Sequence, residues 1–365
     1  MANVKAVRFA IALSATALLF AAPVVAQTWL KGYQYGAPRA TIPYSVADLE
    51  YGKTLRLRID SDRDWVTAEK LNAKVFGPYR VVGDTYYFGT YMTASVVIKT
   101  PEGNVMLNYP WGGDARWGGK DVSAEIIARM EKAGLPLKDI KYYISSESHG
   151  DHNAGVPEII ARTGAKLITM EGDVEEMEGF KSAEYPSAKV DQVIKNGFQL
   201  KLGGKVFTAH HTGGHTKGAT TWVWQETEGG ITYNLAQVCC WSMPSNLVTN
   251  PQFPLETLKR SWEILKSLSV DVPLPGHHPW QFGWFAKMAR LDSGEDRISV
   301  FVDPAGYRGF VAVYEKLFQD NLATQLRDGP PQGRGGRGGA APAGGAAPAG
   351  GRGGRGATGT PPAGQ

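Results

Sequence analysis

A chain of 365 residues, of which 42% are hydrophobic and 20% charged, has enough apolar material to bury a substantial core. The formal charge is +4, and the four arginines after Asp328 account for all of it, so the rest of the chain is nearly neutral and gives no indication of nucleic-acid binding. The only two cysteines are adjacent, Cys239 and Cys240, which excludes a disulfide-rich scaffold. Adjacent cysteines rarely satisfy disulfide geometry, so no bridge is expected.

The N-terminus has the pattern of a secretory signal. Lys5 and Arg8 precede an apolar run, and Val24 and Ala26 occupy the two small-residue positions of a cleavage site. We therefore predict a signal peptide at residues 1–26 and a periplasmic or secreted protein that has no membrane association after cleavage. An uncleaved membrane anchor is the alternative, but a proline and polar residues near the end of the run count against it.

Residues 27–75 form an N-terminal extension of unknown role. Covering the cleft and joining a subunit contact are the two roles considered, and the sequence does not choose between them. Beyond it, residues 76–328 alternate between β and helical patterns and are expected to form one domain. Strands are predicted at 85–100, 104–110, 140–147, 166–170 and 270–276, helices at 122–135, 154–165 and 255–268, and hairpin-like β regions at 197–211 and 220–240. The two halves have similar organisation, which predicts an α/β fold of the αββα sandwich type, with two β-sheets face to face and helices outside.

Residues 329–365 consist almost entirely of Gly, Pro, Ala and Arg and offer almost nothing to bury. Such a tail is expected to stay disordered. Arginine–glycine repeats also occur in RNA-binding segments, but an exported chain favours a solvated or wall-contacting tail.

The histidines fall in three short segments instead of being scattered. They are His149 and His152 in SESHGDHNAG, His210, His211 and His215 in FTAHHTGGHTKG, and His277 and His278 in VDVPLPGHHPW. Histidine is the commonest metal ligand and the usual acid or base near neutral pH. The clustering therefore predicts that folding brings these segments together.

The first of these segments offers four potential ligands within six positions. Glu147 and His149 are two residues apart in an extended segment, so their side chains point the same way. Asp151 and His152 follow where Gly150 lets the chain turn toward a helix. Zinc accepts both imidazole nitrogen and carboxylate oxygen, and a pair of zinc ions can generate a hydroxide nucleophile at neutral pH.

These motifs resemble the metallo-β-lactamase superfamily, and within it most the third subclass of class B metallo-β-lactamases. The pattern His-x-His-x-Asp-His of that family is matched by Glu147, His149, Asp151 and His152, its GHTxG segment by GHTKG, and its CDVxLxxH segment by VDVPLPGH. The segments PYRVVGDTYYFGTY and VFVDPAGYRGFVAVYEKLF are also similar. The resemblance extends from about Gly77 to Gln325.

The resemblance implies a dizinc centre. A first zinc would be held by Glu147, His149 and His215, and a second by Asp151, His152 and His277, with His278 as the rival to His277. A metal-bound hydroxide, oriented by the catalytic Asp151, would attack the carbonyl of a strained amide. His210 and His211 are expected to support the site or the sheet and not to bind metal.

Three positions depart from the family pattern. Glu147 replaces a histidine, which lowers the positive charge of the centre, and Asn108 stands where the superfamily usually has an aspartate, which alters a supporting hydrogen bond. The Ser-x-Ser segment that receives the substrate carboxylate corresponds to residues 240–242. Ser242 and Cys240 are therefore the predicted substrate contacts, with two buried apolar cysteines as the alternative interpretation.

The sequence thus predicts an exported β-lactamase with two zinc ions that acts on a small-molecule substrate and confers antibiotic resistance. A hydrolase of another substrate, such as a lactone or ester, is one alternative, and a non-hydrolytic iron-binding member of the fold is the other. No Asp or Glu occurs between Ile231 and Phe253, where thioesterase and phosphodiesterase relatives carry a bridging aspartate. The sequence makes no prediction of oligomeric state.

Overall fold

The computed structural model describes residues 74–113, 117–239, 243–276 and 281–331. The predicted signal peptide, nearly all of the N-terminal extension and nearly all of the Gly/Arg-rich tail lie outside these ranges. Within them, no helix combines the length and the apolar character needed to cross a membrane.

The first half of the chain forms a seven-stranded sheet whose strands lie side by side in sequence order. They are β1 (Val75–Arg80), β2 (Thr85–Thr90), β3 (Ala94–Ile98), β4 (Asn104–Leu107), β5 (Ile140–Ile144), β6 (Lys166–Met170) and β7 (Gln192–Ile194). The pairs from β1 to β4 are antiparallel, and those from β4 to β7 are parallel. Parallel neighbours need crossover connections, which are usually helical. Here they contain α4 (Gly119–Lys132), then α5 (Gly150–Asn153) with α6 (Val156–Thr163), then α7 (Val174–Gly179).

The second half forms a five-stranded sheet in the order β12-β11-β10-β9-β8. Its strands are β8 (Gln199–Leu202), β9 (Lys205–His211), β10 (Thr220–Glu228), β11 (Ile231–Val238) and β12 (Val272–Pro275). Strands β8 to β11 are joined by hairpins, and two of the turns are Gly-Gly pairs with positive φ, Gly203-Gly204 and Gly229-Gly230. Type I′ turns require this backbone at both central residues, which explains the glycines. The parallel step from β11 to β12 passes through α8 (Leu255–Ser267).

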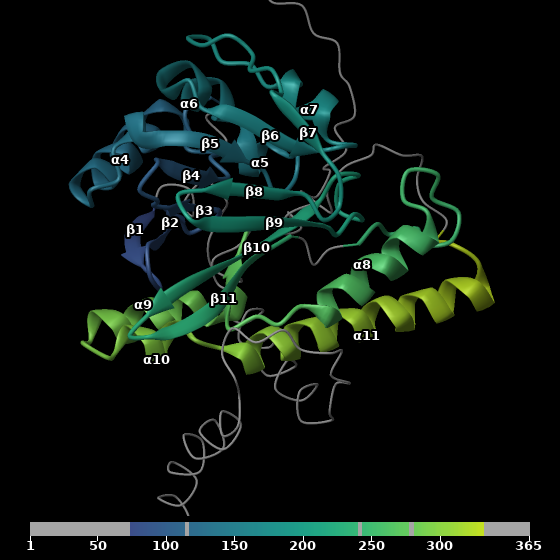
Figure 1. The fold of residues 1–365 in the computed structure, drawn as a ribbon. Coiled ribbons are helices and arrows are strands. Elements are labelled where there is room, and N and C mark those ends of the chain that lie inside the picture. Colours follow the sequence, from purple (N-terminus) through teal and green to yellow (C-terminus); the bar gives the residue numbers. More distant parts are fainter. Residues whose placement is uncertain (1–73, 114–116, 240–242, 277–280, 332–365) are drawn as a thin grey trace, which may run out of the picture. The chain divides into compact units, whose positions relative to one another are not determined.

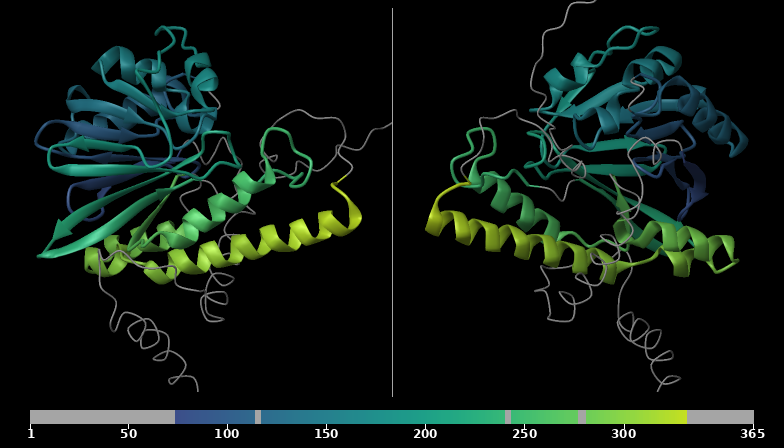
Figure 2. Two further views of the ribbon diagram at one scale, coloured as in Figure 1. Left: turned by 45° about the vertical axis from the view of Figure 1, so that its right-hand side comes forward. Right: turned by 180° about the vertical axis from the view of Figure 1, so that it is seen from behind.

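The two sheets face each other, with helices on their outer sides (Figures 1 and 2). Helices α4, α6 and α7 lie against the first half, and α8 and α11 (Pro304–Asp328) lie against the second. Neighbouring residues of β3 show how the layers form, because side chains alternate across a strand. Val96 belongs to the core shared by both sheets, whereas Val97 belongs to the core beneath α4 and α6. The predicted αββα sandwich is confirmed.

Two local expectations need correction. The predicted strand at 85–100 is an antiparallel pair, β2 and β3, because the chain turns at residues 91–93, where the N–H of Thr90 donates to the carbonyl of Thr93. Cys239 is buried and disulfide-bonded, although the sequence predicted no bridge. The only other cysteine in the chain is Cys240, which lies outside the described residues.

Candidate metal centre

The loop that follows β5 carries the first predicted motif and is tied to both sheets. The N–H of Thr220, the first residue of β10, donates to the carbonyl of Ser146 at 2.7 Å. The indole N–H of Trp222, two residues along β10, donates to the carbonyl of Ser145 at 2.9 Å. Strand β10 belongs to the opposite sheet, so the packing of the two sheets fixes the backbone just before Glu147.

Glu147 lies at the middle of the centre, with only 2% of its surface exposed. Its Oε2 is 2.6 Å from Nδ1 of His149 and 3.3 Å from Nε2 of His215. Its Oε1 is 2.7 Å from Nε2 of His152. The rings of His149 and His215 also approach each other, with Nδ1 and Nε2 at 3.2 Å. Folding therefore brings three histidines from two distant segments onto one buried carboxylate.

Electrostatics favour an ionised Glu147. Burial by itself raises the pKa of this carboxyl, but the charges of His152 and His215 and the hydrogen bonds from His149 and His152 outweigh it and hold the pKa well below the usual range. For His149, burial lowers the pKa, yet the hydrogen bond and the charge of Glu147 raise it to about 9. The ionised carboxylate of Glu147 thus stabilises positive charge on the neighbouring histidines. A bound metal cation would be stabilised by the same carboxylate.

The described residues provide two overlapping donor groups for a metal ion. Glu147, His149 and His215 form one, and Glu147, Asp151 and His152 form the other, with the ligand atoms of each group within 4.8 Å of one another. Imidazole nitrogens and carboxylate oxygens are the donors that zinc accepts. The structure thus brings together five of the six residues predicted to bind metal, and the sixth, His277, lies outside the described residues together with its rival His278.

His152 contacts one of the residues that depart from the family pattern. Nδ2 of Asn108 is 3.1 Å from Nδ1 of His152. The side-chain oxygen of Asn108 accepts from the backbone N–H of Ser146, also at 3.1 Å. Asn108 therefore links the two ends of the first motif, at the place where the sequence predicted an altered supporting hydrogen bond.

His215 lies on the loop between β9 and β10, which is held from two sides. Nε2 of His211 donates to the carbonyl of Lys217 at 2.7 Å. From the other side, Asp173 accepts from the hydroxyl of Thr216 and from the N–H of Gly218, each at 2.7 Å. Asp173 immediately precedes α7 and is buried, which raises its pKa to about 6.

Sequence reasoning gave His211 a supporting role but missed Asp173. A single aspartate between a strand and a helix has no distinctive spacing, so only the fold shows that it faces the His215 loop.

Alanine in place of Asp173 is expected to weaken metal binding by about 10–100-fold, because the loop that carries His215 loses two hydrogen bonds. Asp173→Asn should restore most of the affinity, since the amide oxygen can accept from Gly218 while the amide N–H donates to the hydroxyl of Thr216. Calorimetric titration of the metal-free protein with zinc measures the effect. Glu175→Ala, at an exposed position of α7, is the control. Unchanged affinity in the Asp173→Ala variant would contradict a positioning role.

Two aromatic-rich segments contain Trp111, Trp117, Trp280 and Trp284, and two of these four tryptophans are core residues. Trp111 and Trp284 are fully buried. Trp117 is partly exposed and packs beside Gly150. A Cβ atom at position 150 would lie 3.0 Å from Nε1 of Trp117. Trp280 lies outside the described residues. Trp117 is therefore the one described tryptophan of this group that reaches the first motif.

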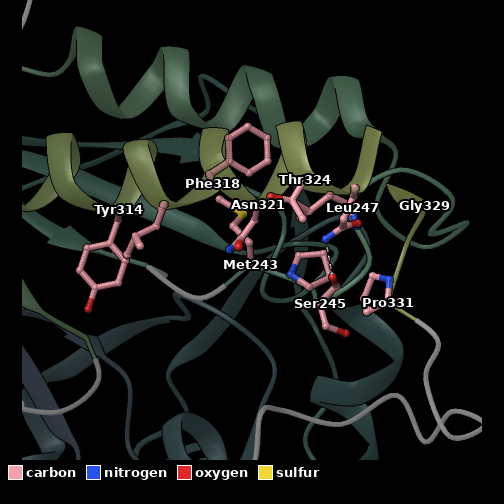
Figure 3. A pocket seen from close by; sticks show the side chains of 12 residues that line it. Met243, Ser245, Leu247, Tyr314, Phe318, Asn321, Thr324, Gly329 and Pro331 are labelled. Atoms are coloured by element: carbon pink, nitrogen blue, oxygen red, sulfur yellow. Dashed lines mark hydrogen bonds between the residues drawn. The ribbon is translucent and has the colours of Figure 1, made fainter. Parts of the chain in front are cut away.

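A groove of about 510 Å³ lies between α11 and the segment that follows residue 242 (Figure 3). Its lining includes Tyr314 and Phe318 of α11 together with Met243 and Ser245. None of the predicted metal ligands among the described residues lines it. The predicted substrate contacts Cys240 and Ser242 fall just before this segment, outside the described residues.

The same fold occurs in proteins of known structure. A family model described as the metallo-β-lactamase superfamily matches residues 117–231. FEZ-1, a metallo-β-lactamase from Legionella gormanii, is 31% identical with a TM-score of 0.61, over 69% of this chain and 98% of FEZ-1. BJP-1, a subclass B3 metallo-β-lactamase of Bradyrhizobium japonicum, is 27% identical with a TM-score of 0.61, over 72% of this chain and 99% of BJP-1. A Cronobacter sakazakii metallo-β-lactamase is 29% identical with a TM-score of 0.62, over 71% of this chain and 99% of that one.

Proposed function

Because the chain belongs to the metallo-β-lactamase superfamily, we propose that it is an exported, zinc-dependent hydrolase that opens the amide of β-lactams and so contributes to antibiotic resistance. The resemblance inferred from the motifs, including the one to the third subclass, is supported by similarity over nearly the full length of FEZ-1 and BJP-1. The observation that carries the proposal is the convergence of His149, His152 and His215 on the buried carboxylate of Glu147. A core carboxylate surrounded by histidines suits a metal centre better than a structural ion pair.

In this proposal the first zinc would be held by Glu147, His149 and His215, and the second by Asp151, His152 and His277. When bound, zinc supplies Lewis acidity and makes water a nucleophile at neutral pH. Asp151 orients that nucleophile toward the substrate carbonyl. Ser242 and Cys240 would receive the carboxylate of the substrate.

The proposed partners and location follow from the ends and the charge of the chain. The secretory pattern of residues 1–26 supports export to the periplasm or the medium, where a small-molecule antibiotic would be met. The near-neutral charge before the tail gives no support to a nucleic-acid substrate.

The purified mature protein is expected to hydrolyse a chromogenic cephalosporin with zinc and to lose that activity with a chelator. Glu147→His should raise turnover, because it removes a negative charge beside the first metal and so strengthens its Lewis acidity. Absorbance-monitored kinetics in zinc, chelator and zinc added back after chelation measure both effects. If two zinc ions bind but no β-lactam is opened, the proposal of β-lactamase activity is wrong. A panel of lactones and esters then tests whether the protein hydrolyses another substrate.

One observation favours the iron-binding alternative. Glu147, His149 and His215 provide two histidines and one carboxylate, a donor set that also suits non-haem iron. Metal analysis of protein purified without added metal distinguishes the two cases. Iron in stoichiometric amount, together with no zinc-dependent hydrolysis, would favour the alternative.

A further inference from the structure

The two carboxylate oxygens of Glu147 face different histidines. Oε2 faces His149 and His215, at 2.6 and 3.3 Å from their nearest ring nitrogens. Oε1 faces His152, at 2.7 Å from Nε2. Glu147 is also the one residue common to the two donor groups found among the described residues. A histidine in this slot has one ring nitrogen free to bind metal, whereas a carboxylate can bind through both oxygens.

We propose that Glu147 bridges two metal ions, with Oε2 on the ion held by His149 and His215 and Oε1 on the ion held by Asp151 and His152. This inference rests on the metal binding of the proposed function and changes the role of Glu147 from a ligand of one ion to a ligand shared by both.

The surroundings of Glu147 hold its side chain in this position. Its backbone carbonyl accepts hydrogen bonds from the hydroxyl of Ser145 and from the side-chain amide of Asn153. Its backbone N–H donates to the oxygen of the same Ser145 hydroxyl at 3.2 Å. The Glu147 side chain itself is only 1% exposed. The backbone of Glu147 is thus anchored and its side chain is enclosed, which favours the observed orientation with Oε2 toward His149 and His215 and Oε1 toward His152.

A shared carboxylate couples the two binding events. Its single negative charge serves both ions, and removing it withdraws one ligand from each of them. A ligand of the first ion alone would behave differently, because its replacement by histidine, the residue of the family pattern, would leave the ligands of the second ion intact.

Stepwise titration of the metal-free protein with zinc, followed by calorimetry, separates these cases. If Glu147 bridges, Glu147→His retains the first site but weakens the second ion by about tenfold or more, since Oε1 is lost. If it does not bridge, the second dissociation constant of Glu147→His changes no more than that of the control variant, and the proposal is wrong.

The control is Glu176→Gln, which removes a nearby negative charge without removing a proposed ligand. Glu176 is exposed, accepts a hydrogen bond from Ser148 and raises the pKa of His149 through its charge. Its effect on the second ion therefore gives the scale of weakening expected when a nearby negative charge is lost, and only weakening well beyond it supports a bridge.

A crystal structure of the unmodified zinc-bound protein tests the same point without a substitution. Each oxygen of Glu147 should lie about 2.0–2.2 Å from a different zinc ion. Both oxygens on one ion, one oxygen without a metal, or a single bound ion would overturn the bridge. Neither experiment contains a substrate, so the bridge can fail while β-lactam hydrolysis holds, and hydrolysis can fail while the bridge holds.

Discussion

Replacing His215 with alanine is expected to lower the rate of cephalosporin hydrolysis by about 10³-fold or more. The catalytic contribution of a metal ion is several kcal/mol, and each 1.36 kcal/mol corresponds to about a tenfold change in rate. His215 is one of three donors in the first group and the only described one that comes from outside the first motif. Its loss should therefore leave too few ligands for the first ion. Steady-state kinetics and metal stoichiometry on the same preparation measure the two consequences.

The matched control is His211→Ala, at the end of β9 immediately before the loop that carries His215. His211 contacts the backbone carbonyl of Lys217 and belongs to neither donor group. Its removal loosens the loop but leaves every proposed ligand in place, so the rate should fall by no more than about 10–100-fold. Equal losses of hydrolysis rate in the two variants would mean that His215 only maintains the conformation of the loop and does not bind metal. An unchanged metal content in His215→Ala would remove this residue from the ligand set.

Local spacing was enough to predict many elements of the two sheets, three of the helices and the first motif, but not β7, α7 or α11. The helix expected at 122–135 is α4 (Gly119–Lys132), and the Gly-Gly turns mark the hairpins of the second sheet. Glu147 and His149 were expected to point the same way from their spacing of two, and their side chains do meet, with Oε2 and Nδ1 2.6 Å apart. These features depend on residues close in sequence, where backbone periodicity and turn chemistry act directly.

Contacts between distant segments could not be predicted in the same way. That His149 and His215 meet at 3.2 Å depends on how the two sheets pack, and the sequence suggested it only through the clustering of histidines. The motif placed Glu147 near His149 and His152, but its spacing did not show which carboxylate oxygen meets which histidine. The hydrogen bonds of Asp173 had no sequence signal, since Asp173 has no recurrent spacing relative to its partners. Only the folded structure shows that Oε2 of Glu147 faces His149 and His215 while Oε1 faces His152.

Alanine in place of Trp222 is expected to destabilise the protein by about 3–5 kcal/mol, the range found when a large aromatic side chain is removed from a packed core. Trp222 is fully buried in the core shared by the two sheets. Its indole N–H also donates to the carbonyl of Ser145, two residues before Glu147. Truncation therefore opens a cavity and releases the backbone of the metal-binding loop. Denaturant unfolding of the metal-free protein measures the loss of stability.

Phenylalanine variants at two tryptophans of β10 separate the packing role of Trp222 from its effect on the metal centre. Trp222→Phe keeps most of the packing but leaves the carbonyl of Ser145 without its indole partner, whereas Trp224→Phe removes the equivalent bond to the hydroxyl of Thr85 on β2. Trp222→Phe should cost about 1–3 kcal/mol of stability, because it leaves the buried carbonyl of Ser145 without its indole donor. Trp224→Phe should cost less, about 1 kcal/mol, because the hydroxyl of Thr85 still donates to Oε1 of Glu226 at 3.0 Å. Of the two variants, only Trp222→Phe should also weaken zinc binding, since the bond of Trp222 reaches the segment before Glu147 and the bond of Trp224 does not. Equal zinc affinities in the two variants would show that the loop keeps its position without the bond from Trp222. The bond between Thr220 and Ser146 would then be the one that links the second sheet to the metal centre.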